Sequence, residues 1–173
     1  PWVPEAPDLH VIGVRVTDDE GAIGYGFSWT PTIGRTAVVA LLRDDIASFA
    51  LGEPADATSL WPRLWEHLHE AGGGGVTTIA MAGLDLALWD LSLRREQRGL
   101  ADALGRRHAD LPVYGSGVNL HYPLEELTAQ VQRWVDRGID AVKIKVGRPD
   151  LADDVQRVAA VRGILGPHRQ LMI

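Results

Sequence analysis

Residues 141–146 (AVKIKV) form an apolar run that two lysines interrupt, Lys143 and Lys145. Alternate side chains of a β-strand point to opposite faces, so the run predicts a strand with both lysines on one face and apolar side chains on the other. A helical pattern precedes this run and another follows it, which is typical of a parallel strand covered on both faces. Two ammonium groups are costly to place there. We therefore expect a site that binds a substrate carboxylate and transfers a proton.

The C-terminal part of the chain alternates strands and helices. Apolar spacing and turn residues predict strands at 111–117, 140–146 and 170–173, and helices at 123–137 and 151–165. This rhythm is typical of a βα barrel or a doubly wound parallel sheet. A closed barrel needs eight strands and typically about 250 residues. Because the chain also ends within an apolar strand, we interpret it as a fragment of a longer functional chain.

The last of these helices has a clear start signal and an apolar face. Asp150 is the expected N-cap of helix 151–165. Helical spacing predicts that five apolar side chains point inward: Leu151, Val155, Val158, Val161 and Leu165.

The N-terminal part predicts a hairpin followed by helices. Residues 9–17 and 22–27 carry the strand patterns, and residues 28–34 are expected to form a loop. Helices are expected at 36–51 and at 59–70.

A third N-terminal helix is expected to end near Arg98, with Thr77 or Thr78 as its N-cap. It is apolar on more than one side, which predicts burial between two layers. Asp85 and Asp90 interrupt the apolar pattern. We interpret both carboxylates as capping or pairing with neighbouring structure.

Composition narrows the class of protein. The 173 residues carry a formal net charge of −6 and no basic block, which argues against a nucleic-acid partner. No run approaches the roughly 18 consecutive apolar residues that span a bilayer. The chain has no cysteine, so disulfides and thiolate metal sites are excluded, and a cytoplasmic location is expected.

Four stretches occur in an order that is specific to one group of enzymes. They are the hairpin segment 14–26, residues 83–91 (GLDLALWDL), residues 113–117 (VYGSG) and residues 141–147 (AVKIKVG). Together they resemble the mandelate racemase/muconate lactonizing enzyme branch of the enolase superfamily. The resemblance implies an α/β fold: an α+β cap domain with the cap-to-barrel helix over residues 1–110, then the first βαβαβ segment of a TIM-like barrel over 111–173, truncated in the third barrel strand.

The chemistry that this resemblance implies is removal of the proton α to a carboxylate. By the family's pattern Lys145 is the base, and Lys143 contacts and neutralises the substrate carboxylate. Strand geometry agrees, because residues i and i+2 lie roughly 7 Å apart. Two ammonium groups at that distance favour loss of a proton from one of them, which a base requires. The resemblance also implies Mg²⁺ as cofactor, which stabilises the enolate.

Other site residues are expected from their position in the family's pattern. Trp29 falls in a loop that resembles the cap-domain loop over the substrate, and His121 falls in the loop after the first barrel strand. Either side chain could bind substrate, or pack in an ordinary way. The family's acidic metal ligands are not within this chain and are expected after Ile173. A further departure is Leu93-Arg94-Arg95-Glu96, where the family usually has Gly-Lys.

The resemblance leaves several functions open. An acid-sugar dehydratase or a 2-hydroxy-acid racemase is the first expectation, that is, a lyase or isomerase acting on a small carboxylate. A cycloisomerase or dipeptide epimerase of the same superfamily is the alternative. A homo-oligomer without nucleic-acid or membrane partners is expected. An alternative of another class is a catalytically silent fragment that lacks the metal ligands.

Overall fold

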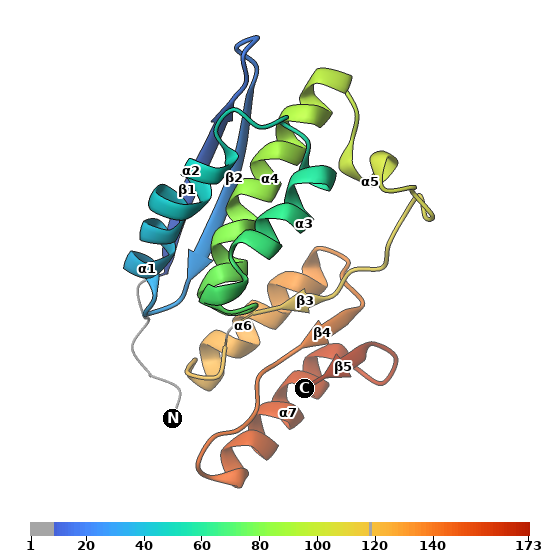
Figure 1. Cartoon of the computed structure of the whole chain (residues 1–173). Coiled ribbons are helices and arrows are strands. Elements are labelled where there is room, and N and C mark those ends of the chain that lie inside the picture. Colours follow the sequence, from blue (N-terminus) through green and yellow to red (C-terminus); the bar gives the residue numbers. More distant parts are fainter. Residues whose placement is uncertain (1–8, 118) are drawn as a thin grey trace. The chain divides into compact units, whose positions relative to one another are not determined.

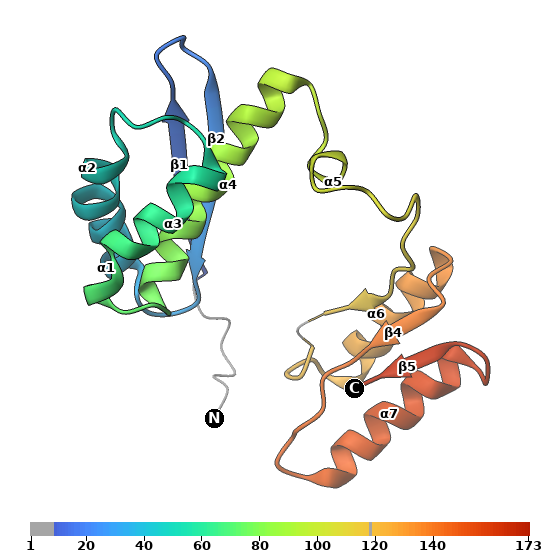
Figure 2. The ribbon, with the colours of Figure 1, turned by 45° about the vertical axis from the view of Figure 1, so that its right-hand side comes forward.

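The structure is a computed structural model that describes residues 9–117 and 119–173. The chain divides into two compact units, the first ending at Arg107 and the second running from His108 to Ile173. Both units are visible in Figures 1 and 2.

The N-terminal unit begins with an antiparallel hairpin of strands β1 (His10–Thr17) and β2 (Ile23–Thr30). Asp18 shapes the turn, because its Oδ1 accepts the backbone N–H groups of Glu20 at 3.0 Å and Ala22 at 2.9 Å. The hairpin prediction is therefore confirmed.

Strand β2 is longer than the sequence predicts, because it runs through residues expected to form a loop. Ser28 and Thr30 are buried, whereas Phe27 and Trp29 on the other face are exposed. A small hydroxyl side chain is tolerated in the buried row because Ser28 Oγ donates to the Ile79 carbonyl at 2.6 Å. The predicted loop at 28–30 is wrong, and Trp29 lies in a strand.

Helices follow the hairpin. Helix α1 (Arg35–Ala40), a π-helical turn η1 (Leu41–Ile46) and α2 (Ala47–Ala50) form one continuous helical segment. Then come α3 (Ala57–His67), a 3₁₀ turn η2 (His69–Ala71), α4 (Val76–Glu96) and α5 (Leu100–Ala103).

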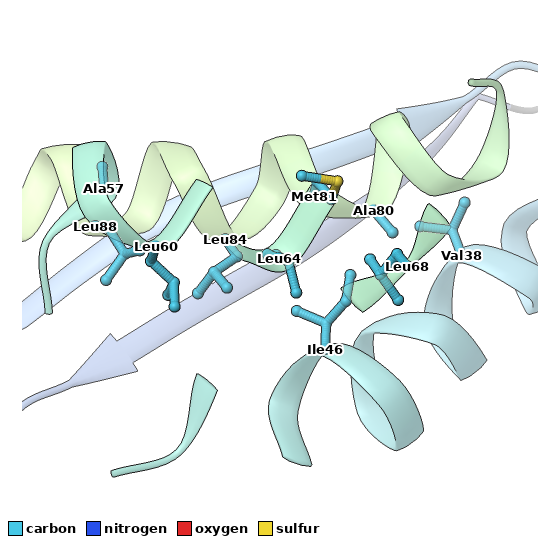
Figure 3. Close-up of a cluster of buried hydrophobic side chains, with 10 residues drawn as sticks. All are labelled: Val38, Ile46, Ala57, Leu60, Leu64, Leu68, Ala80, Met81, Leu84 and Leu88. Atoms are coloured by element: carbon cyan, nitrogen blue, oxygen red, sulfur yellow. The ribbon is translucent and has the colours of Figure 1, made fainter. Parts of the chain in front are cut away.

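The core of this unit lies between helix α4 and its neighbours α1, η1 and α3. Figure 3 shows ten buried apolar side chains that meet there. They are Val38, Ile46, Ala57, Leu60, Leu64, Leu68, Ala80, Met81, Leu84 and Leu88. The predicted burial of α4 between two layers is confirmed, since the helix packs on the hairpin as well.

Helix α4 approaches strand β2 so closely that only glycine fits between them. A Cβ added at Gly24 would lie 2.1 Å from the Ala87 carbonyl oxygen, and one at Gly26 would lie 2.2 Å from that of Gly83. The absence of a side chain at Gly24 and at Gly26 therefore allows this short distance between the helix and the sheet.

Three expectations about α4 have different outcomes. The helix begins at Val76 after Gly75, so the prediction that Thr77 or Thr78 caps it is wrong. Asp90 pairs with neighbouring structure as predicted: its Oδ2 accepts the Tyr25 N–H at 2.8 Å. Asp85 does not pair as predicted, because no hydrogen bond or ion pair joins its carboxylate to another of the described residues. Burial raises the pKa of this carboxylate.

Among the described helices, α4 alone is long and apolar enough to cross a membrane by length and composition. A core helix passes the same test, and α4 packs against both the hairpin and α3.

The C-terminal unit contains strands β3 (Gly115–Ser116), β4 (Ala141–Lys143) and β5 (Gln170–Met172), joined by helices α6 (Leu124–Asp136) and α7 (Leu151–Leu165). The strands are parallel in the order β3-β4-β5. The alternation of strands and helices is confirmed. The strands are shorter than expected because apolar residues such as Leu111 and Val113 are exposed rather than paired.

Helix α7 spans the predicted residues, and Asp150 caps it by accepting the Ala152 N–H at 2.9 Å. Its buried face is only partly as predicted. Val161 and Leu165 are buried, but Leu151 is 74% exposed and Val155 is 60% exposed. Their places inside the unit are taken by Asp154 and Arg157, at 8% and 2% exposure. The buried face is therefore rotated toward two charged residues.

Candidate active site at the carboxyl end of β4

Strand β4 places the two lysines as the alternation predicts. Val142 and Ile144 are fully buried, and they pack with α6 and α7 through Leu127, Val131, Val161 and Leu165. Lys143 is half-buried and Lys145 is exposed, on the opposite face of the strand. Both ammonium groups are therefore carried on the face that turns away from the helices.

Lys145 lies just beyond the regular pairing of β4. The Ile144 N–H still donates to the Met172 carbonyl on β5 at 3.0 Å. The next N–H, that of Lys145, donates instead to Asn119 Oδ1 at 2.9 Å. A side chain thus continues the hydrogen bonding where the strand ends.

Asn119 is completely buried, and it follows β3 in the chain. Its Nδ2 donates to Gln130 Oε1 on α6 at 3.0 Å. Both polar ends of the amide are therefore bonded, as burial requires.

Two guanidinium groups bind the backbone of the loop after β3. Arg157 donates to the Asn119 carbonyl at 2.6 Å and to the Tyr122 carbonyl at 2.8 Å. Arg148 donates to the Leu120 carbonyl at 3.1 Å and to the same Tyr122 carbonyl at 2.8 Å. Burial lowers the pKa of Arg157, and the neighbouring charge of Arg148 lowers it further. The guanidinium stays charged and its hydrogen bonds offset the cost of burial.

Asp154 holds the loop after β4. Its Oδ2 accepts the N–H groups of Gly147 at 2.7 Å and Arg148 at 3.0 Å. Gly147 has a φ of +116°, a conformation that side chains disfavour. The carboxylate and the glycine together turn the chain sharply after Lys145 and lead it into α7.

The other expected substrate-binding residues lie in different surroundings. His121 is exposed on the loop after β3, edge-on to the Tyr122 ring with centroids 4.9 Å apart. It thus belongs to the loop that Arg148 and Arg157 bind. Trp29 is 52% exposed near the end of β2 in the N-terminal unit. Within residues 9–117 and 119–173, no group of three or more His, Asp or Glu side chains could hold a metal ion.

Sequence reasoning missed the buried polar residues Asn119, Asp154 and Arg157. The two charged residues carried a usable signal. Asp154, Arg157 and Val161 have the i, i+3, i+7 spacing of one helical face, which includes the buried part of the apolar stripe. Asn119 gave no such signal, because an asparagine beside a short strand is usually exposed.

A further sequence feature separates the two lysines from all other basic residues. The chain contains no third lysine, so every other basic side chain apart from histidine is an arginine. Arginine keeps its proton in proteins, whereas lysine can lose it. The chain thus has titratable amines on its side chains at only two positions, both on one face of β4.

Comparison with known proteins identifies the family to which the chain belongs. The mandelate racemase/muconate lactonizing enzyme N-terminal domain family matches residues 7–105, and the enolase C-terminal domain-like family matches residues 126–173. A 3,6-anhydro-α-L-galactonate cycloisomerase of Streptomyces coelicolor is 39% identical over 167 residues, which cover 96% of this chain and 46% of that protein.

Solved structures of similar proteins also belong to this group of enzymes. A racemase from Streptomyces coelicolor A3(2) with bound magnesium has a TM-score of 0.88 and 39% identity, over 95% of this chain and 50% of that one. An L-talarate dehydratase from Polaromonas, complexed with Mg and L-glucarate, has a TM-score of 0.83 and 33% identity, over 94% of this chain and 46% of that one.

The chain spans about half the length of the relatives that it matches. Family matches to both units and the high structural similarity confirm the resemblance seen in the sequence. The chain belongs to the mandelate racemase/muconate lactonizing enzyme family of the enolase superfamily.

Proposed function

We propose that this chain supplies the proton-transfer side of an enzyme that removes the α-proton of an acid-sugar carboxylate. Lys145 acts as the base, and Lys143 binds and neutralises the carboxylate. The observation that carries the proposal is the placement of both lysines on one face at the carboxyl end of a parallel strand, where active sites of βα folds lie.

The distribution of basic residues supports a role for the amines themselves. A base must be able to give up its own proton before it takes one from substrate, which excludes arginine. Lysine occurs in this chain only at the two proposed site positions. If positive charge alone were needed at the position of Lys145, arginine would serve there, as it does elsewhere in the chain.

The first chemical step follows from these roles. The neutral amine of Lys145 takes the α-proton, and the electron pair of the broken C–H bond moves toward the carboxylate to form an enediolate. The Lys143 ammonium lies on the same face and stabilises the charge that develops on the carboxylate oxygens. In dehydration the electron pair of the enediolate then forms the Cα–Cβ double bond, and the β-hydroxyl leaves as water with a proton returned by the Lys145 ammonium. In racemisation a second acid gives a proton to the opposite face of the carbon.

The relatives favour an acid-sugar substrate. They include sugar-acid dehydratases and cycloisomerases, and the neighbour from Polaromonas is complexed with L-glucarate. We therefore place dehydration or cycloisomerisation of a sugar acid ahead of racemisation. The two share the α-proton step, so Lys145 has the same role in either.

Magnesium is the cofactor that the solved neighbours suggest, and when bound such an ion stabilises an enediolate. The described residues do not fit it, because they hold no cluster of acidic or imidazole side chains. We assign its ligands to the part of the family fold that this chain does not span.

Exchange of the α-proton in D₂O tests the proposal directly. The full-length protein is incubated with Mg²⁺ and galactarate, L-talarate or L-glucarate, and loss of the α-proton signal is followed by NMR. We expect exchange in the unmodified protein, and a loss of at least about 1,000-fold in Lys145→Arg, because the arginine keeps the charge but cannot accept a proton.

A matched variant distinguishes the loss of a base from the loss of a positive charge. Lys143→Arg keeps a cation at the carboxylate position and should retain exchange within about 30-fold. The proposal fails if none of the three acids loses its α-proton, or if Lys145→Arg exchanges as fast as Lys143→Arg.

A further inference from the structure

Asn119 stands apart among the largest fully buried side chains of the described residues, because all the others are apolar. A buried amide is costly unless all its polar atoms are bonded. Here its Oδ1 accepts the backbone N–H of Lys145 at 2.9 Å, and its Nδ2 donates to Gln130 at 3.0 Å. The contact to the proposed base is therefore built into the core of the unit.

The bond replaces a missing strand contact. Strands β3 and β4 pair only at Gly115 with Val142 and at Ser116 with Lys143. Beyond that point the backbone of β4 on the β3 side has to be held by other groups. The Asn119 side chain provides the acceptor for Lys145, the residue on which the chemistry depends.

We propose that Asn119 is a positioning residue that fixes the backbone of Lys145 and so aims its amine at the substrate. This inference rests on the proposed function, since it assumes that Lys145 is the base. Asn119 itself touches no reacting atom; it acts through the N–H of Lys145.

Arg157 holds the backbone of Asn119 in place. Its guanidinium is 2% exposed and donates to the Asn119 carbonyl at 2.6 Å. Asn119 is thus held at its backbone by α7 and at its side chain by α6, through Gln130. A hydrogen-bond acceptor held from two helices has little freedom to move, so the Lys145 N–H that it binds is held as well.

The expected effect follows from the sensitivity of catalysis to geometry. A misplacement of about 1 Å at a reacting group can lower the rate about 100-fold. Asn119→Leu removes both hydrogen bonds at similar volume, so kcat should fall about 100-fold. KM should change less than about threefold, because Lys143 remains to bind the carboxylate.

Two further variants separate positioning from stability. Asn119→Asp keeps the acceptor for the Lys145 N–H, and we expect it to retain kcat within about fivefold. Val131→Ala removes a fully buried side chain of α6 without removing any hydrogen bond, and it should lower the melting temperature without lowering kcat.

The experiment measures kcat, KM and melting temperature of the full-length protein, together with hydrogen–deuterium exchange of the Lys145 amide. We expect Asn119→Leu to lower kcat and to release the Lys145 amide for fast exchange, with Asn119→Asp close to the unmodified protein in both. Slow exchange of that amide in Asn119→Leu overturns the inference, as does a kcat loss that Val131→Ala reproduces.

The amide measurement also separates this inference from the proposed function. A protein without α-proton exchange refutes Lys145 as the base, whereas the exchange rate of its amide still shows whether Asn119 holds it. An unmodified protein that is active, with a fully active Asn119→Leu variant, refutes the inference alone.

Discussion

The backbone N–H of Tyr25 donates to Asp90 Oδ2 at 2.8 Å, which joins the second strand of the hairpin to helix α4. The same oxygen accepts Arg94 Nε at 2.7 Å, and the Arg94 guanidinium lies 5.7 Å from the centre of the Tyr25 ring. The Tyr25 N–H, and after it Arg94, hold the pKa of Asp90 below its ordinary value. A single carboxylate thus ties strand and helix together at the edge of the glycine contact.

The stability that Asp90 contributes depends on pH in a defined direction. Because its folded-state pKa is lowered, the contribution is present above the unfolded pKa of about 3.9 and is lost as pH falls through the folded value. We expect Asp90→Ala to lower the free energy of unfolding by about 1 kcal/mol at pH 7, given its partial exposure. Urea unfolding at pH 7 and pH 2 measures this loss of stability, and the loss should be smaller at pH 2. An equal loss at both values would contradict it; Asp19→Ala, on the exposed turn, is the control.

Glycines of the hairpin differ sharply in the room around them. We expect Gly24→Ala to lower the free energy of unfolding by about 3 kcal/mol or more, because its Cβ would overlap the Ala87 carbonyl. Gly13→Ala on the same hairpin has no atom within 4 Å of the new Cβ and should be neutral or slightly stabilising. Equilibrium unfolding of the two variants side by side tests this, and similar stabilities would show that the helix can move away.

Asp85 should behave in the opposite sense to Asp90. Burial raises its pKa, so the protonated form is favoured in the fold, and stability relative to the neutral amide is lost as pH rises through that pKa. We expect Asp85→Asn to raise the free energy of unfolding at pH 7 and to leave it unchanged at pH 3. Asp45→Asn, at an exposed position, should change neither, and a destabilising Asp85→Asn would reveal a partner for the carboxylate.

Substitutions of the two lysines should differ in their effects on KM and kcat. Lys143→Met removes the cation that binds the carboxylate and stabilises its developing charge, which costs about 2 kcal/mol and lowers kcat/KM roughly 30-fold, in part through a higher KM. Lys145→Met should lower kcat by a much larger factor than it raises KM. Steady-state kinetics of the full-length variants measure the split, and the reverse pattern would exchange the two roles.

The strand that carries the lysines was predictable because alternation is a local property. Val142 and Ile144 are buried and the lysines face away from them, as the pattern required. Helix α7 was predictable to the residue because Asp150 and Gly166 mark its ends. The length of β2 was not predictable, because serine is typical of loops. Ser28 is accommodated in the strand by a hydrogen bond to the Ile79 carbonyl on α4, which lies far away in the sequence.

The hydrogen-bonded support of the site depends on contacts between distant residues. The stripe of α7 could be drawn through Leu151 and Val155 or through Asp154 and Arg157, and hydropathy favours the first choice. The backbone carbonyls of Asn119 and Tyr122 decide for the second, because they give the buried guanidinium its acceptors. Such acceptors have no signature in a sequence, so the shared spacing of Asp154, Arg157 and Val161 was not enough to outweigh hydropathy.

Arg148 and Arg157 hold residues 119–122 by main-chain oxygens, and a main-chain oxygen is the same whatever amino acid carries it. Substitution of Leu120 or His121 would therefore leave these hydrogen bonds to the loop in place. The fold thereby separates the support of Lys145, the proposed base, from a short segment that is held independently of its side chains.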